Sequence, residues 1–139
     1  MNFNFNFNAE GLIPAIVQQV PTPKDPHSRV LMMAWMNRES LEASLNKGMM
    51  CYWSRSRKRL WCKGETSGHI QRIVRWFVDC DRDTLLFYVD QVGGACHTGF
   101  ASCFFSELNM QGEPLPLQET PLFDADQVYR QSVESPKKD

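Results

Sequence analysis

Short apolar runs separated by turn-forming residues divide most of the chain into segments typical of β-strands. Residues 12–20 (LIPAIVQQV) and 29–36 (RVLMMAWM) are apolar, and the loop between them contains three prolines. Further strands are expected at residues 49–53, 70–78, 84–92 and 102–108. The pattern therefore predicts a domain built mainly from β-strands.

One segment has helical rather than strand character. Asn37 is a good N-cap, Leu41 and Leu45 lie one turn apart, and Gly48 follows as a C-terminal stop, so a helix is expected over residues 38–47. We therefore expect a compact, β-dominated α+β fold with one clear short helix. The NFNFNF opening is a low-complexity stretch, too short to carry a fold by itself.

Length and composition fit one folded domain. The chain has 139 residues, of which 42% are hydrophobic and 22% charged, and no apolar run approaches the roughly 20 residues that span a bilayer. A single domain over residues 1–139 is expected, with a core at about 11–108 and a loosely packed, Pro- and Gln-rich tail at 109–139. The N-terminus does not resemble a secretory signal, which favours a cytoplasmic protein with no membrane partner.

The five cysteines change this picture. Their number is odd, and clustered thiols in a reducing compartment are more often metal ligands or reactive groups than disulfides. Cys51 and Cys62 have apolar or aromatic neighbours and are expected in the core. The other three cysteines are candidates for chemistry.

The stretch DCDRD combines carboxylates with one of these thiols. On an extended strand, Asp79, Asp81 and Asp83 would point to one face and Cys80 to the other. Carboxylate oxygens suit Mg²⁺ and a thiolate suits Zn²⁺, so the stretch could contribute to two metal sites. The alternative is a polar turn between two strands.

A second cysteine segment, GGACHTGFASCFF, supplies further ligands. Cys80, Cys96 and Cys103 make three ligands, the number that a catalytic zinc uses when its fourth position holds water. His97 could complete a structural zinc site instead, so the ligand count leaves both alternatives open. Adjacent residues in an extended chain face opposite ways, which favours His97 as a nearby base rather than a joint ligand with Cys96.

Residues 52–72 are rich in basic and hydroxyl side chains, which suit a phosphate site. Two alternatives are an exposed basic hairpin and a nucleic-acid surface on which Trp53 and Trp61 would stack bases. The cationic region is short and the whole-chain pI is about 6.3, which disfavours a nucleic-acid partner.

Taken in order, the motifs YWSRSR, LWCKGETSG, DCDRD and ACHTGFASCFF closely resemble those of the phosphoribosyl-AMP cyclohydrolase family of histidine biosynthesis. The resemblance runs from GLIPAIVQ to about Phe105. It implies hydrolysis of the N1–C6 bond in the purine ring of 1-(5-phosphoribosyl)-AMP, giving the formimino-carboxamide product. It also implies an intertwined homodimer that depends on Zn²⁺ and Mg²⁺ and acts on a small nucleotide.

The family's functional residues transfer by position. The zinc would be shared between subunits, with Cys80 from one subunit and Cys96 and Cys103 from the other. His97 would be the general base that takes a proton from zinc-activated water. The expected Mg²⁺ ligands are Asp79, Asp81 and Asp83. The residues expected to bind substrate or its phosphates are Trp53, Ser54, Arg55, Lys63, Gly64, Thr66, Ser67, Gly68 and Arg72.

Two departures from the family pattern can be seen in the sequence. Only about thirty residues follow the last motif, too few for the fused pyrophosphohydrolase domain of some relatives, so a monofunctional chain is expected. Phe100 replaces a basic residue that is common after the CHTG glycine. If that basic residue helps to bind phosphate, another residue must do so here.

Two other functions are compatible with cysteine-rich zinc chemistry. A zinc-dependent deaminase would normally carry H-x-E and C-x-x-C patterns, and neither occurs in the sequence. A non-catalytic zinc-stabilised module would use His97 as a fourth ligand.

Overall fold

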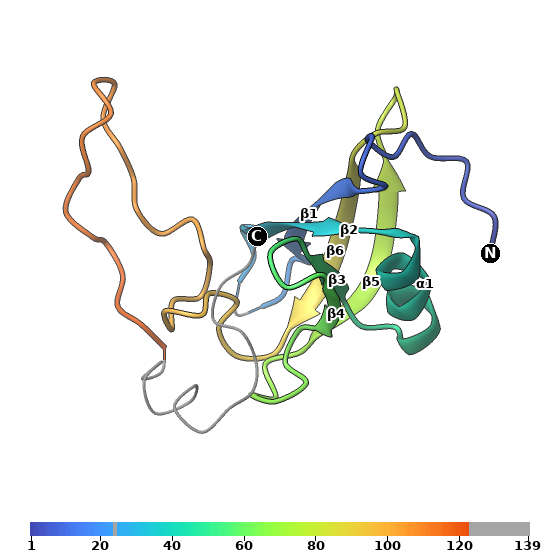
Figure 1. The fold of residues 1–139 in the computed structure, drawn as a ribbon. Coiled ribbons are helices and arrows are strands. Elements are labelled where there is room, and N and C mark those ends of the chain that lie inside the picture. The colour runs from blue at the N-terminus through green and yellow to red at the C-terminus, as the bar shows by residue number, and fades with distance from the viewer. Residues whose placement is uncertain (24, 123–139) are drawn as a thin grey trace.

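A four-stranded sheet with β1 and β6 at its centre organises the fold (Figure 1). The structure is a computed structural model and describes residues 1–23 and 25–122. The strands of this sheet are β1 (Ile13–Gln19), β2 (Val30–Met36), β5 (Gln71–Val78) and β6 (Leu85–Gln91). Their order is β2-β1-β6-β5, with β1 and β6 parallel and the two outer strands antiparallel to their neighbours.

Side-chain alternation gives the sheet one buried face. Ala15 and Val17 of β1, and Phe87 and Val89 of β6, are fully buried at 0% exposure. The helix α1 (Arg38–Lys47) and the hairpin of β3 (Cys51–Ser54) and β4 (Arg59–Cys62) pack in front of the sheet in Figure 1. The predicted β-dominated α+β class is confirmed for the described residues.

The helix begins and ends where the sequence predicts. The Asn37 side chain accepts a hydrogen bond from Ser40 N at 2.8 Å, and the Ser40 hydroxyl accepts one from Asn37 N at 2.9 Å. These two reciprocal bonds form a capping box. Gly48 ends the helix with φ +70°, a left-handed conformation that glycine adopts at little cost. The Ser44 hydroxyl also accepts from Cys51 N at 2.8 Å, which attaches the helix to β3.

Cys51 and Cys62 are buried, as predicted, but they also form a disulfide. The interpretation that clustered thiols of this chain are metal ligands or reactive groups rather than disulfides is therefore wrong for this pair. The reason is the antiparallel register of β3 and β4, in which Cys51 lies directly opposite Cys62. No strand was predicted at residues 59–62, so the sequence offered no register from which to infer the pairing.

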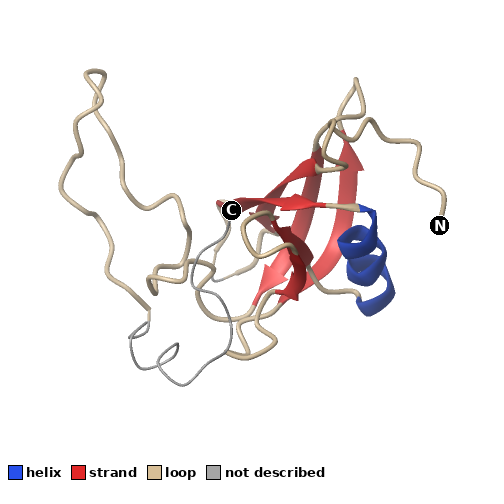
Figure 2. Cartoon of the chain, viewed as in Figure 1, coloured by secondary structure: helices blue, strands red, loops and turns tan. Residues whose placement is uncertain are grey.

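The prediction of a strand at residues 102–108 is wrong. These residues form bends and loop, with an isolated bridge from Leu108 to Pro114, and Figure 2 draws them as loop. The Ser102 hydroxyl accepts a hydrogen bond from Phe104 N at 2.9 Å, and this local bond takes the place of a strand ladder.

Two terminal segments lie against this core. Phe3, Phe5 and Phe7 of the NFNFNF stretch are half-buried and pack on it. The described part of the predicted loose tail is largely exposed but is attached through Glu119 and Leu122, and residues 123–139 lie outside the described residues. No helix among the described residues is long and apolar enough to cross a membrane.

Candidate functional site

The three carboxylates of DCDRD converge on a turn between β5 and β6. One oxygen from each of Asp79, Asp81 and Asp83 lies within 4.8 Å of the others, and all three residues are exposed. The predicted convergence is therefore present, but the predicted cause is wrong. The strand ends at Val78, and a turn with Arg82 at φ +65° gathers the carboxylates instead of strand alternation.

Hydrogen bonds within the turn set its electrostatics. Desolvation raises the pKa of Asp79, but hydrogen bonds from the backbone of Asp83 and Thr84 outweigh it, so this pKa is lowered from its ordinary value. The pKa of Asp81 is raised, chiefly because its carboxyl shares hydrogen bonds with Asp83 and Asp79. Three acids so close together repel one another when ionised, and a divalent cation would relieve that repulsion.

The second cluster is the segment from Ala95 to Cys103, here called the cysteine loop. Cys96 is buried, Cys103 is half-buried, and Gly99 N donates to Cys96 O at 2.9 Å to close a tight turn. His97 lies half-buried beside Cys96 in this turn. The expectation of an extended Cys96–His97 pair is therefore wrong, because the segment is a turn.

Neighbouring groups in the cysteine loop favour the Cys96 thiolate. A hydrogen bond with the Cys103 side chain is the main cause, and together with Thr98 and the nearby His97 it lowers the pKa of Cys96 to about 5 against opposing desolvation. The Cys96 Sγ and Thr98 Oγ1 atoms lie 2.8 Å apart. A thiol that is readily deprotonated has the form that a metal requires.

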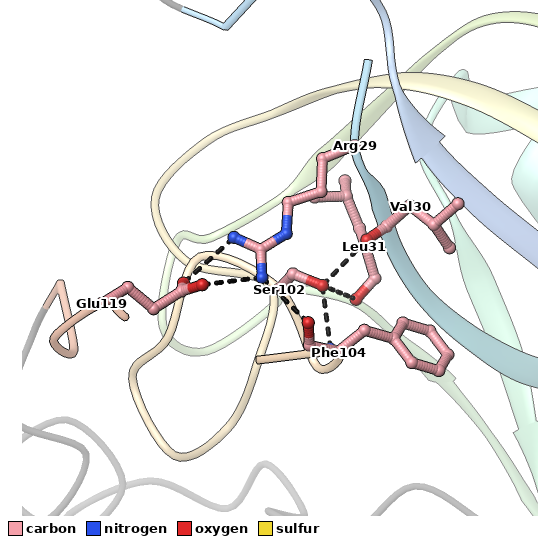
Figure 3. A network of polar contacts seen from close by, with 6 residues as sticks. All are labelled: Arg29, Val30, Leu31, Ser102, Phe104 and Glu119. Carbon is pink, nitrogen blue, oxygen red and sulfur yellow. Dashed lines mark hydrogen bonds and ion pairs between the residues drawn. The ribbon is translucent and has the colours of Figure 1, made fainter. Parts of the chain in front are cut away.

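The cysteine loop is attached to β2 and to the C-terminal segment (Figure 3). The Ser102 hydroxyl donates to Val30 O at 2.8 Å, and Cys103 N donates to Leu31 O at 2.8 Å. The Arg29 guanidinium forms two bonds to the Glu119 carboxylate, at 3.0 and 2.8 Å, and a third to Phe104 O at 2.9 Å. The two residues that flank Cys103 are thus held by the consecutive residues Arg29, Val30 and Leu31, and Glu119 in turn binds Arg29.

Within one chain, the three candidate zinc ligands do not come together. Cys80 is exposed on the carboxylate turn before β6, whereas Cys96 and Cys103 follow β6, whose seven residues span roughly 20 Å. Among the described residues, the only three-residue group of His, Cys, Asp and Glu close enough to hold a metal is the carboxylate group. A single chain therefore brings together two of the three cysteines.

The predicted phosphate residues lie in the β3–β4 hairpin and in the loop that follows it, except Arg72, which lies in β5. Ser54 and Lys63 are buried, and the Arg55 guanidinium lies 5.0 Å from the centre of the Trp35 ring. A Cβ on Gly64 would lie 2.5 Å from the backbone of His69, so only glycine fits where the loop closes on itself. Thr66, Gly68 and Arg72 are exposed, and Trp53 and Ser67 are half-buried.

A cavity of about 720 Å³ adjoins the cysteine loop. Gly93, Ala101, Asp25 and Asp90 are among the residues that line it. The sequence does not point to these two acids, because they lie in separate segments that meet only in the fold. Phe100, the departure from the family pattern, is buried and stacks on Phe105 with 3.8 Å between ring centres, so it packs inside the loop.

An oxygen-donor cluster and a separate thiol pair on a small β-dominated domain define a candidate metal-dependent enzyme. Residues 32–105, more than half of the chain, match the model of the phosphoribosyl-AMP cyclohydrolase family. A phosphoribosyl-AMP cyclohydrolase of Chlorobium chlorochromatii is 53% identical over 88% of this chain and 85% of its own. Those of Alkalilimnicola ehrlichii and Rhodospirillum rubrum are 52% and 51% identical, each over 88% of this chain and 82% of its own.

The chain belongs to the phosphoribosyl-AMP cyclohydrolase family, and it is an enzyme, a hydrolase that acts on a cyclic amidine.

Proposed function

We propose that this chain hydrolyses the N1–C6 bond in the purine ring of 1-(5-phosphoribosyl)-AMP, a step of L-histidine biosynthesis in the cytoplasm. The observation that carries the proposal is the cysteine loop, where His97 adjoins a thiol whose pKa is lowered to about 5. The relatives at 51–53% identity are named for the same substrate.

The donor sets fit the two metals that the family resemblance implies. Cys96 and Cys103, with Cys80 of a second subunit, would hold zinc, because soft thiolates suit it. Asp79, Asp81 and Asp83 would hold Mg²⁺, because hard carboxylate oxygens suit that ion. When bound, zinc lowers the pKa of a coordinated water from about 15.7 to near 7, which makes hydroxide available at neutral pH.

His97 is the proposed proton carrier. An imidazole with a pKa near 6.5 can accept a proton from the attacking water and deliver it to N1 as the N1–C6 bond breaks. Its place beside Cys96 in a tight turn puts it next to the proposed zinc ligands while its side chain stays half-buried. The three cysteines suffice as ligands, which leaves His97 for this task.

Charge separates the parts of the proposed substrate site. The loop from Lys63 to Gly68, here called the phosphate loop, suits the phosphates together with Arg55 and Arg72, because these residues offer cationic and hydroxyl donors. The cavity beside the cysteine loop carries Asp25 and Asp90, which repel phosphate but accept hydrogen bonds from ribose hydroxyls. We therefore assign the sugar to the cavity, and the phosphates to the phosphate loop with Arg55 and Arg72.

The outer face of the four-stranded sheet supports the proposed homodimer. Strand register places Phe77, Leu86, Ile16 and Met33 in one apolar row across all four strands. Phe77 is 47% exposed and Ile16 is 36% exposed. A continuous apolar row on a sheet face is a surface that a second sheet can cover.

A second copy of the chain that covers this apolar face would also complete the zinc site. If a two-fold axis runs across the strands between two stacked sheets, each β6 lies antiparallel to the other. The carboxylate turn of one subunit, with Cys80, then comes to the end of β6 where the partner carries its cysteine loop. One arrangement thus buries the apolar row and supplies the missing ligand.

The catalytic proposal is tested by measuring zinc content and ring opening by absorbance in wild type, His97→Ala and Cys96→Ser. We expect His97→Ala to retain zinc and lose turnover, and Cys96→Ser to lose both. Zinc loss in His97→Ala would instead favour a structural zinc with four protein ligands. Full activity in Cys96→Ser would contradict the zinc mechanism.

The shared site is tested by mixing two inactive variants, Cys80→Ser and Cys96→Ser, after dissociation and reassociation of the subunits. A mixed dimer has one site with all three cysteines intact, so random pairing should restore about a quarter of wild-type activity. Each variant treated alone is the control and should stay inactive. No recovery in the mixture, with mixed dimers verified by light scattering and mass spectrometry, would show that the site is not shared in this way.

A further inference from the structure

Residues 2–8 form an arm at the β5 edge of the sheet, next to the carboxylate turn. In this arm (residues 2–8, NFNFNFN) the asparagines are exposed and the phenylalanines are half-buried. Phe5 stacks on Phe3 at 5.6 Å and meets the edge of Trp76 in β5 at 5.9 Å. Trp76 in turn stacks on the buried Phe87 at 5.4 Å, so the arm is anchored through aromatic contacts to the core.

The polar side of the arm bonds directly to the carboxylate turn. Asn6 N donates to Arg82 O at 2.7 Å, and Asn6 Nδ2 donates to Asp81 O at 2.8 Å. In the other direction, Arg82 Nε donates to Asn4 O, and the Arg82 guanidinium lies 5.4 Å from the centre of the Phe5 ring. Three hydrogen bonds and one cation–π contact therefore connect the arm to two consecutive residues of the turn.

These contacts act against forces that would open the turn. Arg82 has φ +65°, which is unfavourable for a residue other than glycine, and its conformation needs support from its surroundings. Three ionised carboxylates within 4.8 Å also repel one another. The arm holds the backbone of Asp81 and Arg82, which lies between Asp79 and Asp83 in the chain. Opening the turn would require this backbone to move.

We propose that the NFNFNF arm is a positioning element of the carboxylate turn and raises its affinity for a divalent cation. The inference rests on the proposed function for the identity of that cation. The arm itself contributes no ligand. It holds Asp79, Asp81 and Asp83 close together before the cation binds, so that binding does not have to order the turn.

The test uses full-length, zinc-loaded protein and Mn²⁺ as a spectroscopic substitute for Mg²⁺, with free Mn²⁺ measured by electron paramagnetic resonance. Asn6→Ala removes the bond to Asp81 O, and we expect it to weaken Mn²⁺ binding about three- to tenfold. Phe5→Leu removes the ring next to the Arg82 guanidinium and should weaken Mn²⁺ binding several-fold. Asn4→Ala is the matched control, because its side chain is exposed and its carbonyl still accepts from Arg82.

Activity provides a second readout. The Mg²⁺ concentration for half-maximal activity should rise in Asn6→Ala by the same factor as the Mn²⁺ dissociation constant, while kcat at saturating Mg²⁺ and zinc content stay at wild-type values. A general loss of folding would lower kcat at all Mg²⁺ concentrations. The positioning role predicts recovery at high Mg²⁺.

The possible outcomes separate the two proposals. If wild type binds no Mn²⁺, or if Asp81→Asn binds it as tightly as wild type, the cation site of the proposed function is wrong. If wild type binds Mn²⁺ and Asp81→Asn does not, but Asn6→Ala and Phe5→Leu bind as tightly as wild type, the role of the arm is wrong. Equal weakening by Asn4→Ala and Asn6→Ala would also overturn it, because only one of these side chains contacts the turn.

Discussion

Replacing Ser102 by Ala tests how the cysteine loop is held on the sheet. The Ser102 side chain has no exposed surface, and its hydroxyl donates to Val30 O at 2.8 Å and accepts from Phe104 N at 2.9 Å. A second acceptor, Leu31 O, lies at 3.2 Å. Removing the buried hydroxyl therefore takes one hydrogen-bond partner from Val30 O and one from Phe104 N.

The expected loss follows from these contacts. Leaving a buried donor or acceptor without a partner costs about 1–3 kcal/mol. Leu31 O keeps its bond from Cys103 N, and Val30 is 37% exposed, so water can reach part of the site. We therefore expect a loss of about 1.5 kcal/mol in the free energy of unfolding, near the lower end of that range.

Urea unfolding at matched protein and zinc concentrations measures this loss. With a slope of about 1–3 kcal/mol per molar urea, the midpoint should fall by roughly 0.5–1.5 M with an unchanged slope. Ser106→Ala is the control, because Ser106 is exposed and its replacement should shift stability by less than about 0.5 kcal/mol. Equal midpoints for the two variants would refute the view that the buried hydroxyl anchors the loop.

Two further substitutions test other buried contacts by calorimetry. Tyr52→Phe removes the O–H that donates to Gln71 Oε1 at 2.6 Å between two fully buried side chains, and should cost about 1–3 kcal/mol. Gly93→Ala places a Cβ 2.6 Å from the His69 ring at φ +70°, whereas Gly112→Ala at φ +82° meets nothing within 4 Å. Both glycine variants incur about 1–2 kcal/mol of backbone strain, and Gly93→Ala should lose about 1 kcal/mol more; equal losses would contradict the role of this contact.

Local rules predicted the elements whose signals lie within a few residues. The helix has the predicted bounds because the capping box of Asn37 and Ser40 and the stop at Gly48 are local. The strands β1, β2, β5 and β6 lie inside the predicted ranges because short apolar runs between turn-forming residues mark strands with a buried face. The sequence therefore predicts the frame of the sheet well.

The features that were missed depend on contacts between distant segments. The Cys51–Cys62 disulfide needs the register of a hairpin whose second strand was not predicted. The residues after Cys103 were expected to be a strand, but the Ser102 hydroxyl and the Arg29–Glu119 pair hold them as a loop. The carboxylates were predicted to converge, yet the turn that gathers them depends on the conformation of Arg82, which the composition of the stretch does not reveal.

Several residues that hold the two candidate metal-binding loops lie outside the part of the chain that matches the family model. The family match covers residues 32–105 and includes the carboxylate turn and the cysteine loop. The strand β1 lies outside that range but forms the centre of the sheet between β2 and β6. The arm that bonds the carboxylate turn also lies outside it, as does the Arg29–Glu119 pair beside the cysteine loop. The motifs inside the family match therefore do not by themselves fix the geometry of either loop in this chain.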